Sequence, residues 1–344
     1  MKLAILLGNG FDVRIGLDTR YTDFYHYFLT QDAVSRPLNE DGTQQPSEHP
    51  ELVTMMKNNS SQYWVDLELL FGSQLKLFNS IDAIRREKAY LEQKINDFLR
   101  RQQERLTIEP DKYRMLKEQL DNTINGFLKL SNYPTEDEYE VTFITFNYTD
   151  VIDRIVASAQ LETYDGDRIS YVAPVHIHGS IDETVILGVD NVNQYDCPIN
   201  MSGKDELQTI MQKPTLNNIV RSGATGRIRS LIHSVDAVII YGASIGDTDA
   251  TWWKVSSEWL FQNQAHKLSI IGYVDNSTPA SATAQAQIDV YEDRFRRLMC
   301  SQHQDKVKRG MIEPHRCDKW MFDFSSDVIQ IAPNQAFGNL IIDD

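Results

Sequence analysis

The sequence predicts an α/β protein in which a mostly parallel sheet carries helices on both faces and is interrupted by an all-helical insertion. Three observations predict this class. The chain opens on residues 2–7, a run with five consecutive apolar side chains that is typical of a fully buried strand. From residue 139 onward, β-branched and aromatic runs alternate with helical segments, as in parallel sheets. Between these parts, residues 52–131 show helical periodicity.

Two glycines one residue apart, Gly8 and Gly10, follow the opening strand directly. Glycine has no Cβ, so it lets the backbone approach a neighbour closely or adopt positive φ. A buried strand, a glycine turn and a helix form the phosphate-binding corner of many α/β proteins, because the helix N-terminus offers free N–H groups. The stretch lacks the third glycine of the dehydrogenase fingerprint and the Gly-Lys-Ser/Thr ending of a P-loop. An ordinary tight strand–helix turn is therefore the alternative interpretation.

The composition excludes several classes of protein. The 344 residues carry a formal net charge of −15, which disfavours extensive binding to nucleic-acid phosphates. No apolar run approaches the ~18 residues of a membrane span, and the opening run is too short for a signal peptide. Cys197, Cys300 and Cys317 do not make a disulfide framework. We therefore expect a cytoplasmic protein without a membrane partner.

The middle of the chain predicts a loop or lid over residues 31–50, followed by helices. Apolar side chains three or four residues apart form three stripes: Trp64 to Phe78, Ile84 to Phe98, and Tyr113 to Phe127. No strand is expected between residues 52 and 131. We expect residues 1–30 and 139–344 to form the sheet domain and residues 31–138 to form the insertion. Its outer surface could bind a partner or a second copy, or the helices could simply pack within the chain.

Five further strands are predicted at residues 139–146, 174–178, 184–189, 237–241 and 268–274. Polar or small residues lie at the ends of several of them: Asn147, His178, Gly242 with Ser244, and Asn276. The carboxyl ends of parallel strands meet at one edge of a sheet, where open α/β sheets bind ligands. The sequence therefore predicts a ligand site at this edge.

Five motifs, in this order, resemble one family. They are Gly-Asn-Gly-Phe-Asp at 8–12, Gly-Leu-x-Thr-x-Tyr-x-x-Phe at 16–24, Thr-Phe-Asn-Tyr-Thr-Asp at 145–150, His-x-His-Gly-Ser at 176–180, and Gly-x-Ser-Ile-Gly-x-x-Asp at 242–249. The set resembles the bacteriophage abortive-infection family AbiH, which is in turn similar to the sirtuin-like NAD-binding proteins. Asp18 departs from the pattern, because the family commonly has proline there. The resemblance implies a Rossmann-like sheet and NAD as the ligand.

The resemblance also implies roles for particular residues. Asn147 would match the asparagine beside the nicotinamide ribose, and His178 the sirtuin histidine, so these two are the predicted catalytic residues. Asparagine can orient a ribose hydroxyl or a water, and histidine can accept a proton near neutral pH. The predicted NAD-contacting residues are Gly8, Asn9, Gly10, Phe11, Asp12, Gly242, Ser244, Asp249 and Asn276.

Structural alternatives exist for several of these residues. Asn147 and Asp249 could each cap the helix that follows, and Asp12 could be either a cap or a ribose ligand. His176 is expected to pack or hydrogen-bond rather than bind metal. No metal is expected, although Cys300, His303, His315 and Cys317 offer the ligand types of a structural zinc site. Residues 64–68 also resemble a family element, but the sequence gives no role for Asp66 and Glu68.

We expect an NAD-binding effector of antiphage defence that hydrolyses NAD to nicotinamide and ADP-ribose. Such an enzyme must be held inactive until it is triggered, so a homo-oligomer or a defence-system partner, bound through the insertion, is expected. One alternative is a nucleotide sensor that binds NAD or a related nucleotide without cleaving it. Another is a nuclease-type toxin, for which no metal-binding carboxylate cluster is evident in the sequence.

Overall fold

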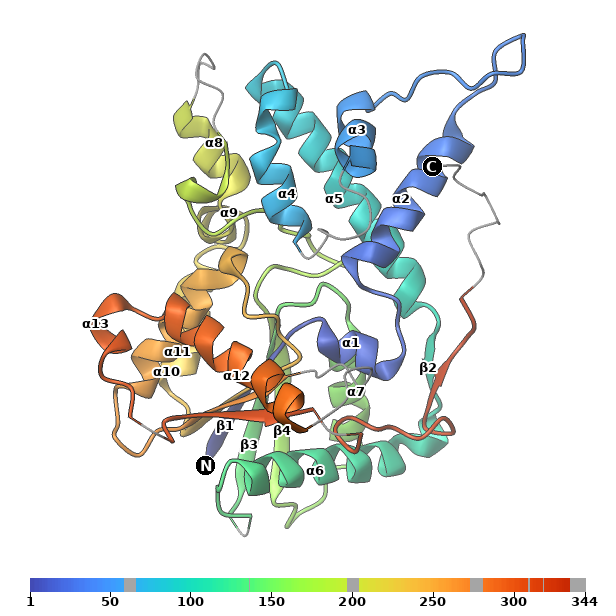
Figure 1. The fold of residues 1–344 in the computed structure, drawn as a ribbon. Helices are drawn as coiled ribbons and strands as arrows, with labels where there is room; N and C mark the ends of the chain where they lie inside the picture. The colour runs from blue at the N-terminus through green and yellow to red at the C-terminus, as the bar shows by residue number, and fades with distance from the viewer. Residues whose placement is uncertain are drawn as a thin grey trace.

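A computed structural model describes residues 1–58, 66–135, 137–196, 204–272, 281–308, 310–317 and 319–334. Its centre is a six-stranded sheet of order β4-β3-β1-β5-β6-β7, in which every neighbouring pair is parallel (Figure 1). The strands are β1 Lys2–Leu7, β3 Tyr139–Thr145, β4 Ile169–His176, β5 Ala237–Tyr241, β6 Leu268–Gly272 and β7 Ile312–Arg316. The predicted α/β class is confirmed.

The strand order identifies the topology. Counted along the chain within this sheet alone, the order reads 3-2-1-4-5-6, which is that of the doubly wound Rossmann fold. The chain builds outward from β1 in one direction through β3 and β4, then returns and builds in the other direction through β5, β6 and β7. The order therefore reverses between β1 and β5. Sheets of this kind bind ligands in the crevice outside the carboxyl ends of the strands at that point.

Both faces of the sheet are covered by helices, as predicted. Along β1, Leu3, Ile5 and Leu7 belong to one buried apolar cluster and Ala4 and Leu6 to another, because successive side chains point to opposite faces. The first cluster includes α6 Tyr113–Leu130 and α7 Val151–Gln160. The second includes α10 Ala224–His233, α11 Ala250–Leu260 and α12 Ser281–Leu298. Burial on both faces explains why β1 reads as a continuous apolar run.

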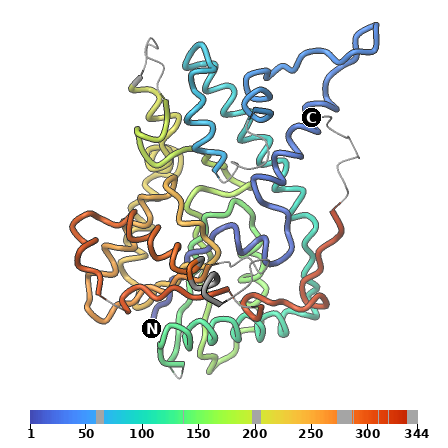
Figure 2. The backbone as a smooth tube through the Cα atoms, in the orientation of Figure 1, coloured from blue at the N-terminus to red at the C-terminus, as the bar shows by residue number. Residues whose placement is uncertain are grey.

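Further helices lie beyond the carboxyl ends of the strands, in the upper half of Figure 1, and the tube in Figure 2 shows the same arrangement. We call α2 Tyr21–Ser35, α3 Pro50–Asn58, α4 Leu67–Ser73, α5 Ile81–Gln103 and α8 Lys204–Met211 the helical layer. Their buried apolar side chains form a third cluster together with residues 181–189. The remaining helices are the short α1 Gly10–Ile15, α9 Lys213–Val220 and α13 Ser301–Gln304.

Part of the predicted insertion is not in the helical layer. Helix α6 packs its apolar stripe of Leu116, Leu120, Ile124 and Phe127 against the sheet. The division of the chain into two domains stays a prediction, as does a partner or oligomer contact through the insertion. The stripe predicted from Trp64 to Phe78 is split, because α4 ends at Ser73 and a 3₁₀ turn follows at Leu75–Leu77; Trp64 itself lies outside the described residues.

One predicted strand is wrong and three strands were not expected. Residues 184–189 are irregular, and their apolar side chains, such as Val185 and Leu187, are buried against the helical layer instead of in the sheet. The short β2 Leu106–Ile108 pairs antiparallel with β8 Ile329–Ile331 in a separate two-stranded sheet, which corrects the expectation of no strand in 52–131. Strand β7 was missed because an edge strand tolerates a polar sequence with proline, here Pro314.

Candidate functional site

A cavity of about 850 Å³ lies at the carboxyl ends of β1, β3 and β5, where the strand order reverses. The sheet edge contributes Gly8, Asn147 and Gly242 to its lining, and the helical layer contributes Glu68 and Phe98. Most of the predicted site residues line it: Gly8, Asn9, Gly10, Asp12, Asn147, His178, Gly242, Ser244 and Asp249. Their roles in binding and catalysis stay predictions.

One of the predicted site residues, Phe11, does not line this cavity. Phe11 is buried in the apolar cluster beneath α6 and α7, where its ring meets Phe322 edge-on with centroids 4.9 Å apart. Phe11 is therefore a core residue, and only its backbone belongs to the glycine corner, the turn at residues 8–11 that joins β1 to α1. Asn276 lies outside the described residues.

The glycine corner is held by the neighbouring strand. The N–H of Gly8 donates to the carbonyl of Tyr241, and the N–H of Gly10 to that of Gly242, both at 2.9 Å. A Cβ on Gly8 would lie 2.4 Å from the Cα of Ala243, and one on Gly10 would lie 2.7 Å from the Cα of Gly242. Gly242 itself has a φ of +64°. Residues 8–10 and 241–243 pass too close to each other for a side chain, so these glycines are required by packing, as the tight-turn interpretation expects.

Gly8→Ala is expected to lower the free energy of unfolding by about 1–3 kcal/mol, because the added methyl group must displace backbone atoms in a packed interior. Chemical denaturation measures this effect. Gly226→Ala is the matched control, since Gly226 lies inside α10 with open space around it. Alanine at that position should be neutral or stabilising by up to about 1 kcal/mol. Equal stability of the two variants would show that the corner tolerates a side chain.

Asp12 and Asn147 meet on the cavity wall. The carboxamide Nδ2 of Asn147 donates to Oδ1 of Asp12 at 3.0 Å, and the hydroxyl of Thr149 donates to Oδ2 at 2.7 Å. Burial raises the pKa of Asp12 to about 6, although both hydrogen bonds oppose the rise. The residue at the N-cap of α7 is Asp150, so Asn147 does not cap that helix. The structure brings Asn147 to the glycine corner through Asp12.

Asn9 has a local role in shaping the cavity rim. Its carboxamide Nδ2 donates to the carbonyl of Thr19 at 3.0 Å, and its Oδ1 accepts from the Thr19 hydroxyl at 2.6 Å. This pair fixes the segment that leads into α2. Ser244 is exposed at the rim, and its carbonyl accepts a hydrogen bond from Arg294.

His178 is buried, and hydrogen-bond partners meet both of its ring nitrogens. Nε2 lies 2.6 Å from Oδ1 of Asp249, and Nδ1 lies 3.4 Å from Nδ2 of Asn217. If the amide donates to Nδ1, then Nε2 carries the proton and donates it to Asp249. Burial, together with the charge of Lys213, lowers the pKa of His178 to about 4. His178 is therefore a neutral imidazole at pH 7.

Sequence reasoning did not identify Lys213 as a site residue. Lys213 opens α9, is 3% exposed, and places its ammonium between the carboxylates of Glu68 and Asp249. The Nζ–Oδ1 distance to Asp249 is 3.0 Å. Burial opposes the charge of both Lys213 and Asp249, but their contacts outweigh it, so the pKa of Lys213 is raised and the pKa of Asp249 is lowered. The side chain of Asp249 makes no cap hydrogen bond to α11 and instead serves this cluster.

The structure also gives roles to Asp66 and Glu68. Asp66 caps α4, where its Oδ1 accepts from the N–H groups of Glu68 and Leu69, and its Oδ2 accepts from the hydroxyl of Thr248. The cap directs the first turn of α4 toward the cavity. Glu68 contacts Lys213 there, and its Oε1 accepts from the N–H of Gly188 at 3.3 Å. Burial raises the pKa of Glu68 to about 8, although Lys213 opposes the rise.

Other candidate ligands of the sequence are scattered. His176 hydrogen-bonds to the carbonyl of Asn147 and to Asp153, as expected. Cys300 lies near Glu258 and Cys317 near the hydroxyl of Tyr241. Across the described ranges, no group of three or more His, Cys, Asp or Glu side chains is arranged to hold a metal ion.

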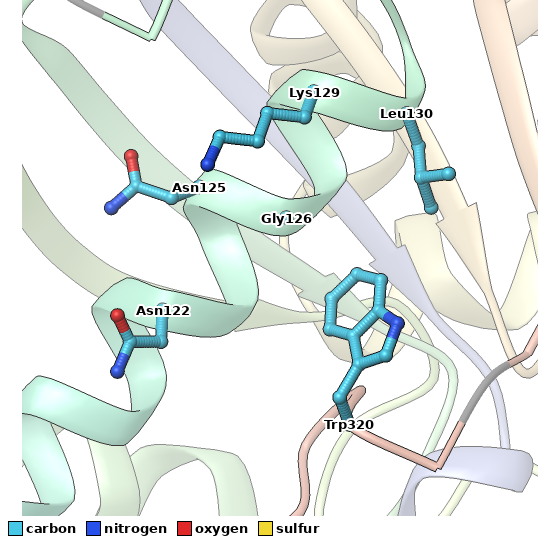
Figure 3. A pocket seen from close by; sticks show the side chains of 6 residues that line it. All are labelled: Asn122, Asn125, Gly126, Lys129, Leu130 and Trp320. Atoms are coloured by element: carbon cyan, nitrogen blue, oxygen red, sulfur yellow. The ribbon is translucent and has the colours of Figure 1, made fainter.

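A second hollow, of about 530 Å³, lies beside α6 and contains none of the predicted site residues (Figure 3). It is lined by Asn122, Asn125, Gly126, Lys129, Leu130 and Trp320. The indole of Trp320 covers Gly126, where a Cβ would lie 2.3 Å from Cζ3 of the ring. The glycine inside α6 is thus explained by packing, and the cavity at the sheet edge stays the candidate site.

The pKa of His178 predicts a loss of stability in acid. The folded state keeps the imidazole neutral down to about pH 4, whereas the unfolded chain protonates it near its ordinary pKa of 6.5. Protonation therefore favours unfolding between these two pH values, by up to about 3 kcal/mol. Denaturation at pH 7 and pH 4 should show that His178→Gln loses less stability in acid than the wild type, and that His26→Gln, at an exposed position, does not. Equal acid loss in all three proteins would contradict the assignment.

The family of the chain follows from comparison with known proteins. Among the described residues, no helix combines the length and the apolar character needed to cross a membrane. A search of curated proteins gave no match. The family model described as Bacteriophage abortive infection AbiH matches residues 4–268, which include β1, the helical layer, β5 and the candidate site residues up to Asp249. The chain therefore belongs to the AbiH family, and its role lies in abortive infection, the defence of a bacterium against phage.

Proposed function

We propose that the protein binds NAD in the cavity at the sheet edge and hydrolyses the bond between nicotinamide and ribose. Loss of NAD would halt an infected cell, which suits abortive infection. One observation carries the proposal: the cavity lies where the strand order reverses in a doubly wound sheet, the point at which such sheets bind dinucleotides. The motifs at this edge also resemble those of the sirtuin-like NAD-binding proteins.

The composition of the cavity supports a ligand of this class. Its volume of about 850 Å³ is within the range of small-molecule and cofactor sites. Aromatic residues, among them Phe146, Tyr148 and Trp253, line it and could pack against the flat rings of a dinucleotide. The carboxylates of Asp12 and Asp249 would favour a substrate whose nicotinamide ring is cationic.

The reaction needs few catalytic groups. Water attacks C1′ of the ribose, the C1′–N bond breaks, and its electron pair neutralises the ring nitrogen, so nicotinamide leaves without a general acid. Asn147, fixed by Asp12, would orient a ribose hydroxyl or the water. His178 is neutral at pH 7 and would take the proton that the water loses at Nδ1, because the 3.4 Å contact of Nδ1 with the Asn217 amide is long for a hydrogen bond and can be exchanged for the water. Fixed carboxylates would stabilise the positive charge that develops on the ribose.

The direct test is to incubate the purified protein with NAD and to separate the products by chromatography. The proposal predicts nicotinamide and ADP-ribose in equal amounts. Binding of NAD without release of nicotinamide would replace hydrolysis by a sensor role. If the protein neither binds nor cleaves NAD under conditions in which it is folded, the proposal is wrong.

A further inference from the structure

Helix α9 and its C-cap present three polar side chains to the segment that carries His178. Lys213, Asn217 and Arg221 are spaced four residues apart and therefore share one face of the helix. The Nζ of Lys213 lies 3.0 Å from Oδ1 of Asp249, and Nδ2 of Asn217 lies 3.4 Å from Nδ1 of His178. Arg221 donates to the carbonyl that directly precedes His178, at 3.2 Å. This face thus contacts both members of the His178–Asp249 pair.

The neighbours of the imidazole decide which of its nitrogens carries the proton. A carboxylate can only accept, so Nε2 of His178, 2.6 Å from Oδ1 of Asp249, carries it. Asp249 is ionised because the ammonium of Lys213 contacts the same oxygen. Nδ1 of the neutral ring therefore keeps a lone pair, and Asn217 faces it with the donor end of its amide.

The carboxamide of Asn217 is buried but has a partner at one end only. The residue is 1% exposed, and within the described ranges no donor meets its Oδ1. Rotating the amide by half a turn exchanges two groups of nearly equal size, so the rotation leaves the occupied space almost unchanged. It brings an acceptor, Oδ1, to the position that the donor Nδ2 occupies now. Because either orientation leaves one end unpaired, neither orientation is locked.

We propose that Asn217 is a positioning residue that turns its amide when His178 gains a proton, donating to Nδ1 of the neutral ring and accepting from Nδ1–H of the imidazolium. This role in turnover rests on the proposed hydrolysis of NAD. The water displaces the amide from Nδ1, its oxygen bonds to C1′ as the C1′–N bond breaks, and one of its protons passes to Nδ1. The turned amide then accepts from Nδ1–H until that proton returns to the solvent.

The charges around the ring show why a second acceptor is useful. In the described part of the chain, the charged groups that face the imidazole are Asp249, Lys213 and Arg221. Burial and the two cations oppose its protonation, Asp249 favours it, and the pKa of His178 is about 4. The imidazolium is therefore costly in this pocket, and Oδ1 of Asn217 is the acceptor that can meet its second N–H.

Asn217→Asp tests the contact without NAD. The new carboxylate, kept ionised by Lys213 on the same helix face, accepts only and should raise the pKa of His178 by about one to three pH units. Nitrogen NMR should show Nδ1 largely unprotonated at pH 7 and pH 5 in the wild type, and at least half protonated at pH 5 in Asn217→Asp. The His178 signal is assigned by its absence from His178→Gln.

Asn218→Asp is the matched control for this experiment, because it makes the same change at the next, exposed position of α9. Its Nδ1 signal should equal that of the wild type. Identical signals in Asn217→Asp and Asn218→Asp would overturn the proposal. A proton on Nδ1 of the wild type at pH 7 would overturn it as well, since the amide would then face the wrong tautomer.

Turnover distinguishes the two ends of the amide. Asn217→Leu can neither donate nor accept and should lower kcat by about 10–100-fold, the effect of losing a hydrogen bond to a charged group. Asn217→Asp should instead move the acid limb of the kcat profile upward by about one to three pH units, because its imidazolium forms at higher pH. A side chain that only fills space would not move this limb, so a wild-type profile in both folded variants would overturn the proposal.

The two readouts separate this proposal from the hydrolysis on which its role in turnover rests. If the NMR result holds but the wild type does not cleave NAD, the proposed hydrolysis is wrong and Asn217 still controls the protonation of His178. If the wild type cleaves NAD but Asn217→Asp leaves Nδ1 unchanged, hydrolysis stands and the role of Asn217 is wrong.

Discussion

Lys213→Met is expected to lower the free energy of unfolding by about 3–5 kcal/mol, the cost of leaving buried charges without their partner. Lys213 contacts two carboxylates, and each of these is held in place by another element of the fold. Glu68 belongs to the helical layer, and Asp249 follows β5. Without the ammonium, the buried carboxylate of Asp249 would lose its charged partner and Glu68 would lose the group that ties it to Asp249, so both the stability of the protein and the attachment of the helical layer should suffer.

Chemical denaturation at pH 7 measures this loss. Lys254→Met is the matched control, because Lys254 lies on α11 but is exposed, and its replacement should change stability by no more than about 0.5 kcal/mol. If Lys213→Met is as stable as Lys254→Met, the contacts of Lys213 do not hold the two parts of the cavity together.

His178→Ala is expected to reduce the release of nicotinamide from NAD by about 10²–10⁴-fold. The reason is its place between Asp249 and the cavity, where it would accept the proton of the attacking water. The imidazole is neutral at pH 7, so the variant removes no buried charge and should stay folded. Asn147→Ala should have a comparable effect, because it removes the carboxamide that Asp12 holds in position to orient a ribose hydroxyl or the water.

The assay is the chromatographic measurement of nicotinamide, with far-UV circular dichroism to check the fold of each variant. His26→Ala and Asn122→Ala are controls at exposed positions outside the cavity, and both should retain wild-type turnover. Wild-type turnover in His178→Ala would remove this residue from the mechanism, and wild-type turnover in Asn147→Ala would do the same for the asparagine.

The sheet could be predicted from the sequence because its signals are local. Strand β1 is buried on both faces and therefore reads as an uninterrupted apolar run, and the same holds for β5; β6 is equally buried and mostly apolar, with Ser269 as its one polar residue. A parallel sheet then brings the ends of β1, β3 and β5 to one edge, which is why Gly8, Asn147 and Gly242 line the same cavity. Residues 184–189 carry a similar local pattern but bury it beneath helices, and no local signal separates these two outcomes.

The charged cluster could be predicted only in part. Asp249 and His178 were expected at the edge because they belong to glycine-containing motifs at strand ends. Lys213 carries no such signal, since a lysine beside Pro214 near the start of a short helix is an ordinary surface pattern. Its contact with Glu68 depends on how the helical layer sits over the sheet, and that is a property of tertiary packing. The contacts of Lys213 with Glu68 and Asp249 are therefore visible only in the folded structure.

The proposed mechanism depends on NAD occupying the cavity where the strand order reverses. A crystal structure of His178→Ala, which should bind NAD without cleaving it, can show the ligand in place if the crystal is grown at a saturating concentration of NAD. We expect density for the intact dinucleotide between the Gly8–Gly10 corner and the helical layer, with its nicotinamide ribose at Asn147. Density for NAD at any other place, or an empty cavity in a crystal that was saturated with NAD, would contradict it.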